Sequence, residues 1–166
     1  MRTRTIAIAT VAALAFAGTA ALFATPGSGV LTSQVWARGT FTHPVDIKIK
    51  VEDGRQEVLH VPDTRESVIQ QIVFGPGGSS GWHSHPGPAL ALIKSGALTL
   101  YDGDDPSCLP HTYTAGQAFV DAGQGHVHMA RNLSSTENAE VWVTYLDVPP
   151  GQSPRADQPS PGNCLF

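Results

Sequence analysis

The sequence has few charged residues, since Asp, Glu, Lys and Arg make up 14% of its 166 residues, against about a quarter in an average globular domain. This deficit excludes a coiled coil or a long helical protein, which would be rich in Glu, Lys and Arg. The 10 Lys and Arg are outnumbered by 14 Asp and Glu, for a formal net charge of −4. The basic surface of a nucleic-acid-binding protein is therefore missing, and we expect no nucleic-acid partner.

The chain also lacks a convincing helical pattern, whereas its 17 Gly and 13 Pro supply many turns. Residues 45–51 alternate strictly between apolar and polar side chains, which is typical of a half-buried strand. Asp53-Gly54 follows as a hairpin signal, and 75–81 is expected to be a loop. Further short apolar runs predict strands over 57–61, 67–74, 89–94, 97–101, 113–114, 118–120, 126–131 and 140–146. This spacing of short strands predicts an all-β sandwich or barrel.

The first residues differ in composition from the rest of the chain. Arg2 and Arg4 precede an uncharged stretch, 6–24, that is dominated by Ala, Leu, Ile, Val and Phe. This pattern predicts that 1–24 is a secretory signal peptide, with an uncleaved N-terminal anchor as the alternative. We therefore expect an exported protein of the extracellular space or cell envelope, bacterial in source, that contacts a membrane only through this segment if it is retained.

The two cysteines do not form a CxxC redox motif. Cys108 lies in a turn-like run and Cys164 lies in a Pro-rich tail, 149–166. In an exported chain two cysteines are expected to pair, and this disulfide would tie the tail to the domain. Two free thiols are the alternative. The predicted organisation is completed by a linker over 25–34 and one barrel domain over 35–148.

Four of the seven histidines form two pairs with one residue between them, His83-Ser84-His85 and His126-Val127-His128. Residues i and i+2 of a strand point to the same face, so each pair presents two imidazoles to one side of a sheet. Neutral imidazole is a common ligand of Zn, Fe, Cu and Ni, and a catalytic metal site needs about three protein ligands. Two histidines from one strand and one from another would supply these ligands. The alternative is that the histidines are polar surface residues.

The spacing around both pairs resembles the signature motifs of the cupin superfamily. Gly77, five residues, the first His-x-His pair and then Gly96 are similar to the first motif. Residues 125–132 resemble the end of the second motif, with His128 at its ligand position, although the usual Pro upstream is replaced within 121–123. The resemblance implies a single-domain antiparallel β-barrel of jelly-roll type that holds a divalent transition metal: Fe, Cu, Ni, Zn or Mn.

One family ligand is missing, because position 89, where the motif has Glu, is Ala89. Three interpretations remain open. The first is a site of three histidines, His83, His85 and His128, as in some cupin dioxygenases. The second adds His126 as a fourth ligand, and the third is loss of the metal, which leaves a pocket for a sugar or an acid. A neutral set of ligands leaves a divalent ion its full charge and favours an anionic substrate.

Other residues are weaker candidates. His126 is alternatively an acid or base beside the metal, or a histidine at the barrel mouth that bonds to backbone or water. One of Gln70 and Gln71 faces inward if their strand is regular, and Gln71 is the candidate pocket residue. Tyr101 is a second candidate for the substrate pocket, with a position in the core or at the rim as the alternative.

Together these observations predict an exported, metal-binding cupin that binds or acts on a small anionic molecule. A three-histidine dioxygenase-like enzyme is one form of this hypothesis, and a metal-dependent oxygenase or isomerase is the broader class. The alternative is a binding module of the cell envelope without metal or catalysis. A small-molecule ligand is the expected partner, and by analogy with the family a homodimer would form through the strand near 45–51.

Overall fold

The computed structural model describes residues 23–52 and 56–166, so nearly all of the predicted export segment, 1–24, and the Asp53-Gly54 turn lie outside the described residues. Within that part of the chain there is no helix, hence none with the length and hydrophobicity to cross a membrane. The strands are β1 (Ser28–Thr40), β2 (Ile47–Glu52), β3 (Gln56–Val61), β4 (Glu66–Ser79), β5 (His83–Ser84), β6 (Ala89–Ser95), β7 (Ala97–Asp102), β8 (His111–Thr114), β9 (Ala118–Asp121), β10 (His128–Arg131), β11 (Ala139–Val148) and β12 (Ala156–Asp157).

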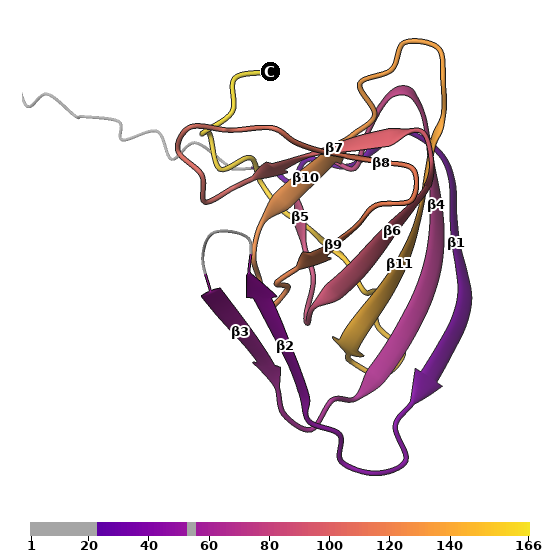
Figure 1. Cartoon of the computed structure of the whole chain (residues 1–166), viewed down its shortest axis with the longest axis vertical. Helices are drawn as coiled ribbons and strands as arrows, with labels where there is room; N and C mark the ends of the chain where they lie inside the picture. Colours follow the sequence, from indigo (N-terminus) through magenta and orange to yellow (C-terminus); the bar gives the residue numbers. More distant parts are fainter. Residues whose placement is uncertain (1–22, 53–55) are drawn as a thin grey trace, which may run out of the picture.

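Ten of these strands form one antiparallel sheet that curls into a nearly closed barrel (Figure 1). Its main path runs β12-β5-β10-β4-β11-β6-β9, with β1 on the free side of β4 and with β7 and β8 added beside β10. The remaining two strands, β2 and β3, pair only with each other as a hairpin beside the barrel. The prediction of an all-β antiparallel barrel is confirmed.

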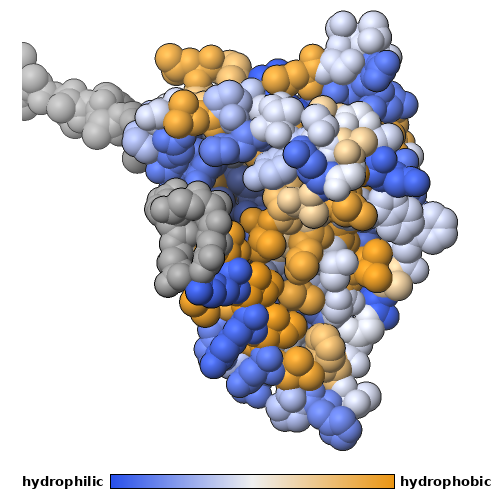
Figure 2. Space-filling model, in the orientation of Figure 1, coloured by the Kyte–Doolittle hydropathy of each residue, from blue (hydrophilic) through white to orange (hydrophobic). Residues whose placement is uncertain are grey.

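The barrel core follows from the alternation of side chains along β6 and β11. On β11, Ala139, Val141, Val143 and Tyr145 are buried, whereas the residues between them are half-buried. On β6 the same period leaves leucines at positions 90 and 92 exposed on the outer surface. Figure 2 shows hydrophobic side chains gathered in the middle of the face that carries β6 and β9. Inward-facing residues thus line the barrel interior, where the candidate site lies.

Two sequence predictions about the first half of the chain are wrong. β1 begins at Ser28, inside the predicted linker 25–34, and pairs with β4 from Ser28 to Thr40. Its side chains are exposed throughout, so an apolar alternation that would have marked a strand is absent. The predicted loop 75–81 is largely the end of β4. Its glycines allow close backbone approach, since a Cβ added to Gly78 would lie 2.7 Å from the carbonyl oxygen of Gly29.

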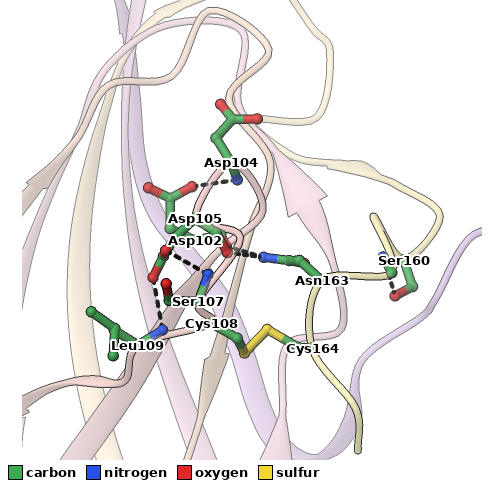
Figure 3. Close-up of a disulfide and its surroundings, with 10 residues drawn as sticks. Asp102, Asp104, Asp105, Ser107, Cys108, Leu109, Ser160, Asn163 and Cys164 are labelled. Carbon is green, nitrogen blue, oxygen red and sulfur yellow. Dashed lines mark hydrogen bonds between the residues drawn. A yellow bond between two sulfur atoms is a disulfide. The ribbon is translucent and has the colours of Figure 1, made fainter.

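The Pro-rich tail is fixed to the barrel by covalent and polar contacts (Figure 3). Cys108 and Cys164 form the predicted disulfide. Beside it, the side-chain amide of Asn163 donates hydrogen bonds to the carbonyl oxygens of Asp102, at 2.8 Å, and Asp105, at 2.6 Å. Earlier in the tail, β12 pairs with β5, the strand on which the first histidine pair begins. The tail therefore belongs to the fold and reaches the candidate site.

Candidate metal centre

Strand pairing brings the two histidine pairs together inside the barrel. His128 opens β10 directly opposite His83 of β5, and His85 follows two residues later. One ring nitrogen from each of these three histidines lies within 4.8 Å of the others. All three side chains are buried. The structure thus brings together the three residues predicted as metal ligands.

Each of the first two imidazoles has an outer partner for Nδ1. Nδ1 of His83 donates to the carbonyl oxygen of Gly81 at 3.0 Å, and Nδ1 of His85 donates to that of Pro154 at 2.7 Å. A carbonyl oxygen only accepts hydrogen bonds, so Nδ1 carries the proton in both rings. Their Nε2 atoms are consequently left with a lone pair. This is the arrangement by which outer hydrogen bonds orient metal-binding histidines.

His83 and His85 are neutral at physiological pH. Burial, followed by the electrostatic effect of nearby His128, lowers the pKa of His85 to about 4. Burial likewise lowers the pKa of His83 well below its usual 6.5, with the same neighbour as the next cause. Neutral imidazole is the form that binds a metal, so these two residues are ready to act as ligands without losing a proton.

The third imidazole is supported by a carboxylate that the sequence analysis did not identify as part of the site. Oδ2 of Asp121, at the end of β9, lies 3.1 Å from Nδ1 of His128, at ion-pair distance although the ring N–H is not aimed straight at it. Burial raises the pKa of Asp121, but hydrogen bonds with His126 and His128 outweigh this and lower it below its usual range, so the carboxylate is ionised. The one available signal was that the family's Pro is replaced within 121–123.

His126 does not join the three-histidine group and instead lies in a separate cluster with Asp121 and His128. Its Nδ1 lies 2.9 Å from Oδ2 of Asp121, and its Nε2 lies 3.0 Å from Oδ1 of Asp102. The hydrogen bond with Asp121 raises the pKa of His126 to about 9, so both ring nitrogens carry protons at pH 7. The physical reason is that β10 begins only at His128, so the rule that i and i+2 share a face does not apply.

A cavity of about 290 Å³ opens beside the three histidines. Its wall is mostly apolar, with side chains from β4, β6, β7 and β11, and it also includes Ser153, Pro154 and Arg155 of the tail. Arg155 donates to the carbonyl oxygen of Ser80 at 2.5 Å and to Asp157 at 2.8 Å. The tail therefore supplies both a hydrogen-bond acceptor for a candidate ligand and the positive side chain of the cavity wall.

The two predicted substrate-pocket residues lie elsewhere. Gln70 lines the cavity, whereas Gln71 faces outward, where it accepts a hydrogen bond from Nε1 of Trp36 at 3.0 Å and donates one to Glu140 at 2.8 Å. Tyr101 is buried in a second cluster with Trp82, Met129 and Cys164, away from the cavity wall. Both positions follow from strand phase, because the even-numbered residues of this part of β4 and of β7 line the cavity.

Comparison with protein families gives one match, a model described as a cupin domain, over residues 70–153. This range is about half of the chain and contains all three histidines of the candidate centre. A search of curated proteins found no match.

Solved structures give similarities at low identity. A polyketide cyclase from Streptomyces resistomycificus is 16% identical over 56% of this chain and 59% of its own, with a TM-score of 0.45. A cupin 2 conserved barrel domain protein from Salinispora arenicola is 20% identical over 47% of this chain and 60% of its own, with a TM-score of 0.41. An oxalate oxidase is 22% identical over 49% and 41%, with a TM-score of 0.42. The chain thus spans about half the length of these proteins.

Proposed function

The chain belongs to the cupin domain family, and on that premise we propose that it is a metal-binding cupin that binds or acts on a small anionic molecule. The observation that carries the proposal is the trio of buried imidazoles beside a cavity. His83, His85 and His128 would hold the ion. Three ligands leave coordination positions open on the cavity side, as a catalytic or substrate-binding metal requires.

The charges of the cavity wall support an anionic ligand only when a metal is present. Three side chains of the wall carry a formal charge, namely Arg155, Asp121 and Asp157, for a sum of −1. A divalent ion would change this sum to +1, and its neutral imidazole ligands would leave its own charge undiminished. Binding of an anion should therefore depend on the metal, which disfavours an acid-binding pocket without one.

The residues around the ion have separate tasks in this proposal. A divalent ion in this position would act as a Lewis acid and template, and iron there would suit the dioxygenase-like chemistry of three-histidine cupins. The guanidinium of Arg155 offers donors that orient a carboxylate. Burial raises the pKa of Tyr145 above its usual 10, so its hydroxyl stays protonated as a donor, with its ring centroid 4.9 Å from that of His85.

Export is the second part of the proposal. Disulfides persist in oxidising compartments, and the bond between Cys108 and Cys164 supports a location outside the cytoplasm. The composition of residues 1–24 points the same way. Mass determination of the protein recovered from the medium or cell envelope would test this, because a mature chain that lacks about 24 residues is expected.

Metal content tests the proposed function. Protein purified without a histidine tag should contain about one equivalent of Fe, Cu, Ni, Zn or Mn by elemental analysis. His83→Ala and His128→Ala should lose it, whereas His60→Ala, which changes an exposed histidine of the β2–β3 hairpin, should keep it. Native protein that holds no metal, even after reconstitution with each ion, would overturn the proposal.

Titration with malonate, a small dicarboxylate, tests the dependence on the metal. Calorimetry should detect binding to the metal-loaded protein and none to the protein treated with chelator. Equal binding to both forms would support the alternative, a binding module that does not use a metal.

A further inference from the structure

The carboxylate missing from β6 has a counterpart on the adjacent strand. β6 and β9 pair in an antiparallel register that sets Ala89 directly opposite Asp121. Directly opposed residues project to the same face with Cβ atoms about 5 Å apart. Both side chains are buried, and both line the cavity beside the three histidines. The barrel therefore keeps an acidic group beside the position where the first motif has Glu, one strand away.

Two hydrogen-bond donors hold this carboxylate in one orientation, and a third nitrogen lies at ion-pair distance from it. Oδ1 of Asp121 accepts a hydrogen bond from the backbone N–H of Gly123 at 2.9 Å. Oδ2 lies 2.9 Å from Nδ1 of His126 and 3.1 Å from Nδ1 of His128. His126 is itself anchored on its other side by Asp102. The group is thus fixed behind the third candidate ligand, on the side of the ring opposite Nε2.

We propose that Asp121 is a positioning residue that compensates for Ala89, an inference that rests on the proposed metal site. Its Oδ2 faces Nδ1 of His128 at 3.1 Å, so in this proposal it would hold the proton on that nitrogen and direct Nε2 toward the centre shared with His83 and His85. An ionised carboxylate behind an imidazole raises the basicity of the ring as a ligand. Asp121 also places a carboxylate, which it shares with the protonated His126, near the position of the missing Glu.

Asp121 differs from the groups behind the other two histidines because it is a side chain and they are backbone carbonyl oxygens. His83 and His85 have backbone carbonyl oxygens behind Nδ1, at Gly81 and Pro154, and those oxygens are present whatever the side chains are. His128 alone depends on a side chain for this support. A single substitution at Asp121 therefore removes the support and the charge together, without altering a ligand.

Metal affinity and the spectrum of bound Co²⁺ test the inference. The dissociation constant for Co²⁺ at pH 7, measured by chelator competition, should rise about 10- to 100-fold in Asp121→Asn and Asp121→Ala. The visible absorption of bound Co²⁺ should also change in both, because a freed His128 ring alters the ligand geometry. The double variant Ala89→Glu with Asp121→Ala, which moves the carboxylate back across the strand pair, should recover at least tenfold of the loss.

Matched variants separate this inference from the metal site itself. Asp157→Asn removes a negative charge from the same cavity wall at a carboxylate that bonds to Arg155 rather than to an imidazole, and should leave the dissociation constant within threefold. His83→Ala should abolish binding. If wild-type protein binds no Co²⁺, the proposed metal site fails. If it binds Co²⁺ in a manner that requires His83 while Asp121→Asn stays within threefold, the role of Asp121 fails.

Two further outcomes would overturn the role proposed for Asp121. An equal loss in Asp157→Asn and Asp121→Asn would reduce the effect to cavity charge and overturn the positioning role. A double variant no better than Asp121→Ala would overturn compensation for Ala89. Near-ultraviolet circular dichroism checks that each variant is folded, and Asp121→Asn, which is nearly isosteric, provides the test if Asp121→Ala does not fold.

Discussion

The two His-x-His pairs have the same spacing, but they differ in how many of their histidines enter the candidate centre. His83 and His85 both enter the candidate centre, whereas of the second pair only His128 does so. The first pair lies where β5 runs between β10 and β12, with backbone partners on both sides. The second begins in a turn, where Gly123, Gln124 and Gly125 all have positive φ, and enters a strand only at its last residue. Two residues at i and i+2 therefore face the same side only where the backbone between them is a regular strand.

The pairs also differ in what supports them. The first pair rests on backbone carbonyl oxygens at Gly81 and Pro154, and its members are neutral because burial lowers their pKa values. The second pair shares the carboxylate of Asp121, whose hydrogen bond raises the pKa of His126. Two chemically similar pairs thus become a pair of candidate ligands and a pair made of one candidate ligand and one cation.

The largest expected contrast is between His85→Ala and His126→Ala. Loss of one of three ligands should abolish stoichiometric metal binding, whereas loss of His126, which only anchors Asp121, should weaken binding by no more than about tenfold. Elemental analysis and chelator competition on both variants measure this. Equal losses would show that the two pairs are equivalent, against the geometry described above.

Removal of the disulfide should act on the support of the first pair. Cys108→Ser with Cys164→Ser opens a loop defined by a sequence separation of 56, which should lower the free energy of unfolding by about 4 kcal/mol. Metal affinity should fall as well, because the freed tail carries the carbonyl oxygen that orients His85. Urea unfolding of the double variant measures the stability change, and a loss under about 1 kcal/mol would mean that the tail is held without the disulfide.

The pH dependence of stability should separate the pairs in the metal-free protein. The pKa of His85 falls to about 4 on folding, so its contribution to stability is complete above pH 6.5 and is lost as the pH falls toward 4. The pKa of His126 rises to about 9, so its contribution is complete below pH 6.5 and is lost as the pH rises toward 9. Each loss should amount to about 3 kcal/mol in urea unfolding experiments, since one pKa unit corresponds to about 1.4 kcal/mol.

Substitutions at His85 and His126 test whether these residues cause the acid and the alkaline loss of stability. His85→Gln should reduce the loss of stability in acid and leave the alkaline loss unchanged, and His126→Gln should do the reverse. A wild-type protein whose stability is constant from pH 4 to pH 9 would contradict both assignments.

The smallest expected effect concerns the turn before the second pair. Gly125 has a φ of +91° and open space around its missing Cβ, so Gly125→Ala should cost about 1 kcal/mol of stability through backbone strain alone. Gly39→Ala, at a position equally open but with ordinary φ, is the matched control and should change stability little. Thermal unfolding compares the two, and equal midpoints would show that the turn tolerates a side chain.

Much of the fold could be predicted from alternation and turns. The strands of β6 and β11 alternate clearly because one face is buried, and the motif spacing correctly singled out three histidines that converge. β1 was missed because all of its residues are exposed, so its sequence carries no alternation. β4 was predicted too short because its last residues are glycine-rich and pair through backbone alone.

The site residues that the sequence did not predict were missed for a different reason. Asp121 reaches the site because β9 pairs with β6, and Pro154 and Arg155 reach it because the tail is bound across the barrel. None of these contacts follows from local spacing, since each joins segments far apart in the chain. Gln71 was preferred over Gln70 for lack of the strand phase, which only the packed sheet establishes.

The position of Pro154 has a consequence for the order in which the protein matures. Synthesis runs from the N-terminus, so β1 to β11, with Gly81 and Asp121, leave the ribosome before the segment that holds His85. His85 lacks its acceptor until the tail docks across the barrel, and the disulfide between Cys108 and Cys164 secures this contact.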